Sequence, residues 1–87
     1  MFESLYTQEI RTFIRTRPWP TGLIYEVREA DEPAPHLNLI FFVDNWIKLD
    51  PADHLIIVGI VKDIVHKLGN EGVPIYVGKV SGSGLAN

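Results

Sequence analysis

Apolar residues recur along the chain at two different spacings, and these spacings predict where helices and strands lie. Residues 2–16 place apolar side chains at steps of three and four, which is typical of an amphipathic helix. Residues 23–29 alternate between apolar and polar types, as a half-buried strand does. Residues 37–43 are almost entirely apolar, which indicates a central strand buried on both faces. The acidic, proline-containing stretch 30–36 is therefore expected to be a hairpin loop.

The clearest helix signal in the chain begins after Asp50. Asp50 can cap the first turn, and Pro51 suits the first helical position because its missing N–H is not needed there. The apolar stripe of this helix comprises Ile57, Val61, Ile64 and Leu68, flanked by Ile60 and Val65. We expect the helix to end at Gly69 or Asn70, since both residue types adopt the left-handed conformation that terminates helices.

Residues 73–80 form the last predicted strand, and Pro74 confines it to an edge or to a strand start. The order α-β-β-α-β predicts an α+β fold with a three-stranded mixed sheet packed with two helices, in which a right-handed crossover makes the third strand parallel to the second. The same order also fits a ferredoxin-like fold that lacks its first strand, with a slot left open for another chain. We expect a single small domain over residues 1–80 and a flexible C-terminal tail over residues 81–87.

Apolar residues make up 46% of the chain, which is high for a domain of 87 residues with little interior. They concentrate in residues 37–43 and 55–61, more than one helix-on-sheet interface requires. If each face of the sheet holds one helix, no apolar face is exposed. If both helices cover the same face, the central strand leaves apolar side chains on the open side. That side would carry one of two sets, either Ile40 and Phe42, or Leu39, Phe41 and Val43.

The formal charge of −3 is unevenly distributed along the chain. Residues 18–54 sum to −5, whereas the segments before and after them each sum to +1. Because an acidic surface repels phosphate, we expect no nucleic-acid partner. One alternative is binding of single-stranded RNA by stacking on the sheet aromatics Phe41, Phe42 and Tyr76. A small basic edge on the first helix, which we interpret as a solvated face, comprises Arg11, Arg15 and Arg17.

Residues that could carry out chemistry are few. The chain has no cysteine, and it contains no phosphate-binding loop, nucleophile elbow or zinc-protease motif. Asp44 follows an apolar strand, with Asp50 and Asp53 nearby, so these carboxylates could bind a divalent cation for phosphoryl transfer or nuclease activity. A strand-ending turn and helix capping explain the same three residues. We therefore expect no enzyme activity, no catalytic residue and no cofactor, and keep the metal site as an alternative.

The chain carries no sign of a membrane or of export. No apolar run approaches the roughly 18 residues that a membrane span needs. The first residues lack the basic and apolar pattern of a secretory signal. We expect a cytoplasmic protein without a membrane partner.

The apolar excess, the acidic middle segment and the lack of a catalytic motif favour a small non-enzymatic accessory protein that binds another protein. We expect it also to pair with itself as a homodimer. Small acidic chains of this kind are common among virus- and phage-encoded proteins that act on a host protein, which is an analogy of composition. The predicted contact surface comprises Trp19, Phe42, Trp46, Leu55, Gly59 and Tyr76.

Overall fold

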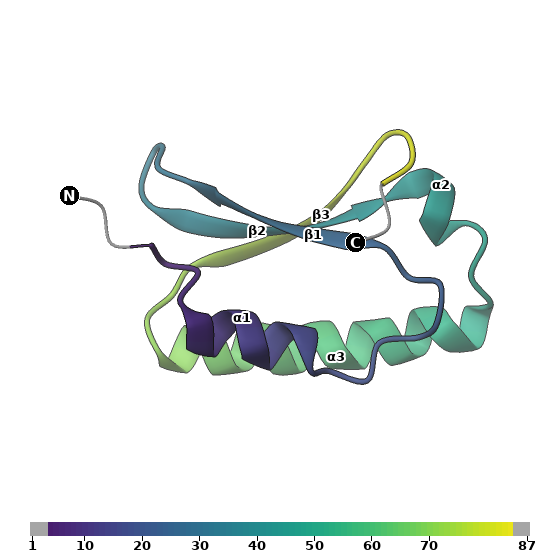
Figure 1. Ribbon diagram of the computed structural model, residues 1–87, viewed down its shortest axis with the longest axis horizontal. Coiled ribbons are helices and arrows are strands. Elements are labelled where there is room, and N and C mark those ends of the chain that lie inside the picture. The colour runs from purple at the N-terminus through teal and green to yellow at the C-terminus, as the bar shows by residue number, and fades with distance from the viewer. Residues whose placement is uncertain (1–3, 85–87) are drawn as a thin grey trace.

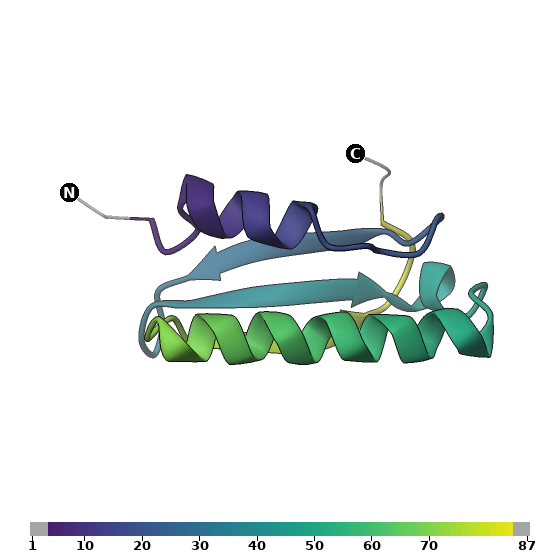
Figure 2. The ribbon, with the colours of Figure 1, turned by 90° about the horizontal axis from the view of Figure 1, so that it is seen from below.

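Two helices lie antiparallel to each other against one face of a three-stranded sheet (Figures 1 and 2). The computed structural model describes residues 4–84. In chain order the elements are α1 (Gln8–Arg15), β1 (Tyr25–Ala30), β2 (His36–Phe42), α2 (Val43–Trp46), α3 (Pro51–Asn70) and β3 (Ile75–Val80). Apart from the short helix α2, this is the predicted order α-β-β-α-β, and the α+β class is confirmed.

The sheet has the strand order β1-β2-β3, with the apolar strand β2 at its centre as predicted. Strand β1 runs antiparallel to β2 and pairs Val27 with Leu39, whereas β3 runs parallel to β2 and places Val77 beside Leu39. Because β3 pairs directly with β2, the sheet has no slot between these strands, and the alternative of a ferredoxin-like fold with an open slot is wrong. Within the described chain, β1 and β3 each have one free edge.

The core lies between the sheet and the two long helices. It comprises Ile10 and Ile14 of α1, Leu37, Leu39 and Phe41 of β2, and Ile57, Ile60, Ile64 and Leu68 of α3. Ile40 is also buried but belongs to the other face of the sheet, because successive strand residues point to opposite sides. Both helices therefore cover the same face. Of the two sets predicted for the open side, Ile40 and Phe42 lie there, but Ile40 is buried and Phe42 is half-buried, so these two side chains are not the exposed apolar surface that was expected.

Helix α1 begins later than predicted because Thr7 is its N-cap. The Thr7 hydroxyl accepts a backbone N–H of the first turn at 3.3 Å. The residues before it reach β1 instead, since the Ser4 hydroxyl and the Tyr6 N–H both donate to Glu29 Oε1. These hydrogen bonds, that of Ser4 first, lower the pKa of the Glu29 carboxyl. The predicted helical residues 2–3 lie outside the described residues.

Helix α3 begins at Pro51, directly after Asp50, as predicted, although the Asp50 carboxylate makes no capping hydrogen bond. Helix α3 ends at Asn70, one of the two predicted positions, but neither Gly69 nor Asn70 takes the left-handed conformation that was expected there. Gly72 instead takes the left-handed conformation, with a φ of 73°.

The buried side of α3 is also rotated relative to the predicted stripe. Ile60, predicted as a flanking residue, is buried in the core, whereas Val61 is only half-buried and Val65 is exposed. The helix therefore turns Val65 away from the core, whereas Val61 packs against the margin of the core.

Asp44 and Asn45, predicted as a strand-ending turn, lie in the short helix α2, which also takes in Val43, predicted as the last residue of the strand. The Trp46 ring packs on Phe41 of β2 with 5.5 Å between ring centroids. It also stacks on the His54 imidazole at 4.4 Å, and His54 Nε2 lies 2.8 Å from the Trp46 carbonyl oxygen. Helix α2 thus connects the end of β2 to the first turn of α3.

The first residues of the predicted C-terminal tail fold back on α2. The Gly84 N–H donates to Asn45 Oδ1 at 2.9 Å, and the Ser83 hydroxyl donates to Asp44 Oδ2 at 3.2 Å. Residues 83 and 84 of the predicted tail thus contact α2. Residues 85–87 lie outside the described residues.

Two glycines give opposite predictions for substitution by alanine. At Gly84 an added Cβ would lie 2.6 Å from Phe42 Cε2 and 2.8 Å from Ile24 Cγ2. We expect Gly84→Ala to lower the free energy of unfolding by about 1–3 kcal/mol through overpacking. At Gly59 an added Cβ meets no atom within 4 Å. Gly59→Ala should raise stability by about 0.5–1 kcal/mol, because alanine is the better helix former. Urea unfolding measures both changes, and a neutral Gly84→Ala would contradict this packing.

Candidate functional site

Exposed large apolar side chains are unevenly distributed among the elements. Within residues 4–84 they belong to α2 and the residue after it, to α3 and to β3, and none belongs to α1 or β1. They are Val43, Ile47, Leu55, Ile56, Val58, Val65, Tyr76 and Val77. The exposed residues of α1 and β1 are polar or charged, Arg11, Arg15 and Arg28 among them. Exposed apolar side chains that lie next to one another are typical of a protein contact.

Val58, Val61 and Val65 form an apolar flank along α3. Because they recur at steps of three and four residues, they lie along one side of the helix. The opposite flank faces α1, since Lys67 Nζ lies 5.0 Å from the centroid of the Phe13 ring. The valine flank therefore lies on the outer side of α3, away from α1, where the side chains of Val58 and Val65 are 44% and 41% exposed.

Val77 continues this apolar flank onto the sheet. It pairs with the core residue Leu39, so its side chain lies on the face that the helices cover. It is nonetheless 41% exposed, because β3 is the last strand of the sheet in the described chain. We call Val58, Val61, Val65 and Val77 together the α3–β3 strip. Leu55, which is 75% exposed, lies one turn before Val58.

The free edge of β3, beside this strip, presents backbone groups that can pair with another strand. The Leu37 N–H donates to the Pro74 carbonyl oxygen at 2.9 Å, so Pro74 directs its backbone toward β2. Successive residues of a strand direct their backbone groups to opposite sides, and Ile75, Val77 and Lys79 therefore direct theirs outward. Pro74, which lacks an N–H, therefore does not remove a donor from the outward edge of the strand. The edge can donate and accept along its whole length.

Two of the six predicted contact residues pack within the domain itself. The Trp19 indole N–H donates to the Ile14 carbonyl oxygen at 2.8 Å, and its ring lies 4.9 Å from that of Tyr25. Trp46 packs on Phe41 and His54. Both tryptophans therefore have a packing role in the single chain.

The other four predicted contact residues lie on two different surfaces. Phe42 and Tyr76 belong to the open face of the sheet, where the Tyr76 ring, 62% exposed, meets the edge of His36 at 5.2 Å. Leu55 and Gly59 lie on the outward side of α3. The structure thus does not bring the six residues together. Sequence reasoning missed the exposed valines of the α3–β3 strip.

No protein-family model, curated protein or solved structure matches the chain. The candidate site rests on its own geometry.

The carboxylates of the alternative metal site have separate roles. Asp44 accepts the hydrogen bond of Ser83, Asp50 precedes α3, and Asp53 lies in its first turn. Among residues 4–84, no group of three or more His, Asp or Glu side chains is placed to hold a metal ion.

The aromatic residues considered for RNA stacking do not share one surface. Phe41 is buried on the face that the helices cover, whereas Phe42 and Tyr76 belong to the open face.

No helix in the described part of the chain combines the length and the apolar character needed to cross a bilayer.

Proposed function

We propose that the protein acts by binding protein surfaces, and that it pairs with a second copy of itself through the α3–β3 strip and the free edge of β3. The observation that carries this proposal is the apolar outer flank of α3. A helix that covers a sheet is expected to be apolar only where strands lie beneath it. The outer flank of α3 is apolar beyond the last strand, as though the sheet continued past β3. A further strand beside β3 would cover it.

The sequence of β3 favours a second copy of the same strand. In antiparallel pairing about a two-fold axis at Val77, Tyr76 lies opposite Gly78 of the second copy, and Gly78 opposite its Tyr76. A cross-strand aromatic ring covers the bare backbone of a glycine, and an added Cβ at Gly78 has no atom within 4 Å. The exposed Tyr76 ring of each copy would thus lie over the unfilled space at Gly78 of the other copy.

Charge and backbone also agree with this pairing. Lys79 lies opposite Ile75 of the second copy, so no two like charges meet directly across the strands. Val77, whose N–H and carbonyl point outward, would exchange two hydrogen bonds with its own symmetry equivalent. The two sheets would then form one continuous sheet, with the two α3 valine flanks side by side beneath it.

Amide hydrogen exchange tests this proposal residue by residue. At high micromolar protein concentration we expect the Val77 N–H to exchange at least about tenfold more slowly than in dilute solution, because a new hydrogen bond protects it. The Val27 N–H, on the free edge of β1, serves as the internal control and should not change. Equal exchange of Val77 at all concentrations would contradict pairing through this edge.

We propose the cytoplasm as the compartment where this binding takes place. The chain has no cysteine, whereas small secreted domains usually depend on disulfides for stability.

A further inference from the structure

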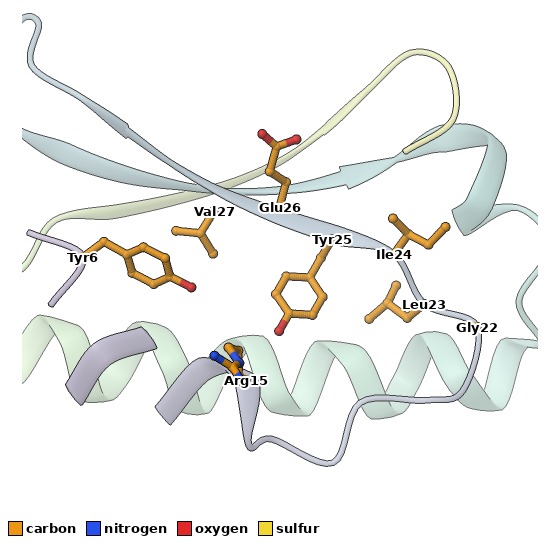
Figure 3. Close-up of a pocket in the computed structure, with 8 residues that line it drawn as sticks. All are labelled: Tyr6, Arg15, Gly22, Leu23, Ile24, Tyr25, Glu26 and Val27. Carbon is orange, nitrogen blue, oxygen red and sulfur yellow. The ribbon is translucent and has the colours of Figure 1, made fainter. Parts of the chain in front are cut away.

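A groove of about 700 Å³ lies on the opposite side of the molecule from the α3–β3 strip. It is lined by residues 22–27, which lead into and form the first half of β1, and by Tyr6 and Arg15. Figure 3 shows the rings of Tyr6 and Tyr25 and the side chain of Arg15 in the space between β1 and α1. Glu26 points away from this space, to the open face of the sheet.

The wall of the groove includes backbone groups of the free edge of β1. Since Leu37 directs its N–H toward β3, its neighbours in β2 direct theirs toward β1. Asn38 and Ile40 are therefore hydrogen-bonding partners of Arg28 and Glu26 across the antiparallel ladder. By the same alternation, the intervening residues of β1 direct their N–H and carbonyl groups away from the sheet. In the groove these are Tyr25 and Val27.

The groove is positively charged on its helix side. Within residues 4–84 the two ion pairs are Arg28 with Glu26 and Lys67 with Glu71, and neither Arg11 nor Arg15 belongs to them. Two carboxylates lie nearby. Glu26 is held by Arg28 at 2.8 Å, and Glu29 accepts hydrogen bonds from Ser4 and Tyr6 and offsets the charge of Arg11. The guanidinium of Arg15 is thus left to interact with a ligand.

Two phenol groups add neutral donors to the same wall. Tyrosine hydroxyls are protonated at neutral pH, and burial raises the pKa values of Tyr6 and Tyr25 further above their ordinary value. The Arg11 guanidinium lies 4.8 Å from the centroid of the Tyr6 ring, which adds a second positive charge beside the groove. Hydroxyl donors next to guanidinium groups favour a carboxylate as the ligand group.

We propose that this groove binds an extended acidic peptide segment of a partner protein, which adds as a further strand to the free edge of β1. Tyr25 and Val27 pair with the peptide backbone, and Arg15 binds an acidic side chain on the helix side of the added strand. The rings of Tyr6 and Tyr25 form the wall along which the peptide lies. The site uses the opposite edge of the sheet from the proposed self-association, and either can hold without the other.

A titration with short peptides, followed by amide NMR shifts, tests this proposal. The probe is a blocked hexapeptide of alternating threonine and glutamate, and the charge control replaces its glutamates with lysines. We expect the acidic peptide to shift the amide signals of Tyr25 and Val27 and to bind at least about tenfold more tightly than the basic one. Equal affinity for both peptides, or no shift on β1, would overturn the proposal.

Backbone N-methylation of the acidic peptide tests strand addition specifically. The glutamate side chains lie on the helix side of the added strand, as those of Tyr25 and Val27 do. In antiparallel addition, residues directly across the ladder share a face, so the glutamate N–H groups point toward β1. In parallel addition, the threonine N–H groups point toward β1 instead. Methylating one of these two sets should abolish binding, while methylating the other leaves it intact. Unchanged binding with both sets methylated in turn would rule out backbone pairing.

A charge reversal in the protein completes the test. Arg15→Glu should weaken binding of the acidic peptide at least about tenfold, because a charge-assisted hydrogen bond is replaced by repulsion. Lys48→Glu, an equal change at an exposed position between α2 and α3, is the matched control and should leave the affinity unchanged. An Arg15→Glu protein that binds as well as the control would overturn the role of Arg15.

Discussion

Replacing Leu39 with alanine is expected to lower the free energy of unfolding by about 3–5 kcal/mol, the upper range for a buried leucine. Leu39 is 0% exposed and lies at the centre of the middle strand, between Val27 and Val77. Both helices press on this face of the sheet, so the layers cannot close over the missing methyl groups without losing other contacts. The loss would be a large part of the stability of so small a domain.

Leu55→Ala is the matched control for this prediction. Leu55 is 75% exposed on α3, and its replacement should change the free energy of unfolding by no more than about 0.5 kcal/mol. Urea unfolding at low micromolar concentration measures both variants without a contribution from association. A Leu39→Ala change below about 1 kcal/mol, or an equal loss for Leu55→Ala, would contradict the arrangement of layers described above.

The double variant Val58→Glu, Val65→Glu is expected to weaken self-association at least about a hundredfold, because like charges brought together in an interface cost several kcal/mol. Both valines belong to the α3–β3 strip and are exposed in the single chain, so the carboxylates remain in water when the chain is alone. In the dimer the two-fold axis would bring four of them together beneath the joined sheets. The fold should therefore survive while the association is lost.

Ile56→Glu provides the matched control on the same helix. Ile56 is exposed to a similar degree but lies on the flank of α3 that faces α1, away from the strip. Its substitution should leave the association unchanged. Circular dichroism verifies that all variants remain folded, and a double variant that still associates like the Ile56→Glu protein would rule out this surface.

The main elements could be predicted from residue patterns because those patterns reflect burial. The almost entirely apolar run of 37–43 identified the central strand, and Pro51 identified the start of α3. The ends of the elements were harder to predict. Several neighbouring residues suit each end, and the tertiary structure determines which of them ends the helix or strand. Gly69 and Gly72 both suit a helix end, and only Gly72 adopts the left-handed conformation. The spacing before Thr7 fitted a helix as well, but those residues bond to β1.

The candidate surfaces were harder to predict than the elements. The sequence marked aromatic residues such as Trp19 and Trp46 as contacts, but whether an indole folds back on its own domain depends on distant partners. Val65 was placed beside the buried stripe, because a helical period cannot show where the last strand beneath a helix ends. The groove at Arg15 is lined by residues of both α1 and β1. The sequence alone could not show that the basic edge of α1 lies beside that strand.

Sedimentation equilibrium of the unmodified chain tests most directly whether the α3–β3 side joins two copies. At high micromolar concentration we expect a mass of twice the 9.8 kDa of one chain, falling toward that of a single chain on dilution. A mass of one chain over the whole concentration range would contradict it.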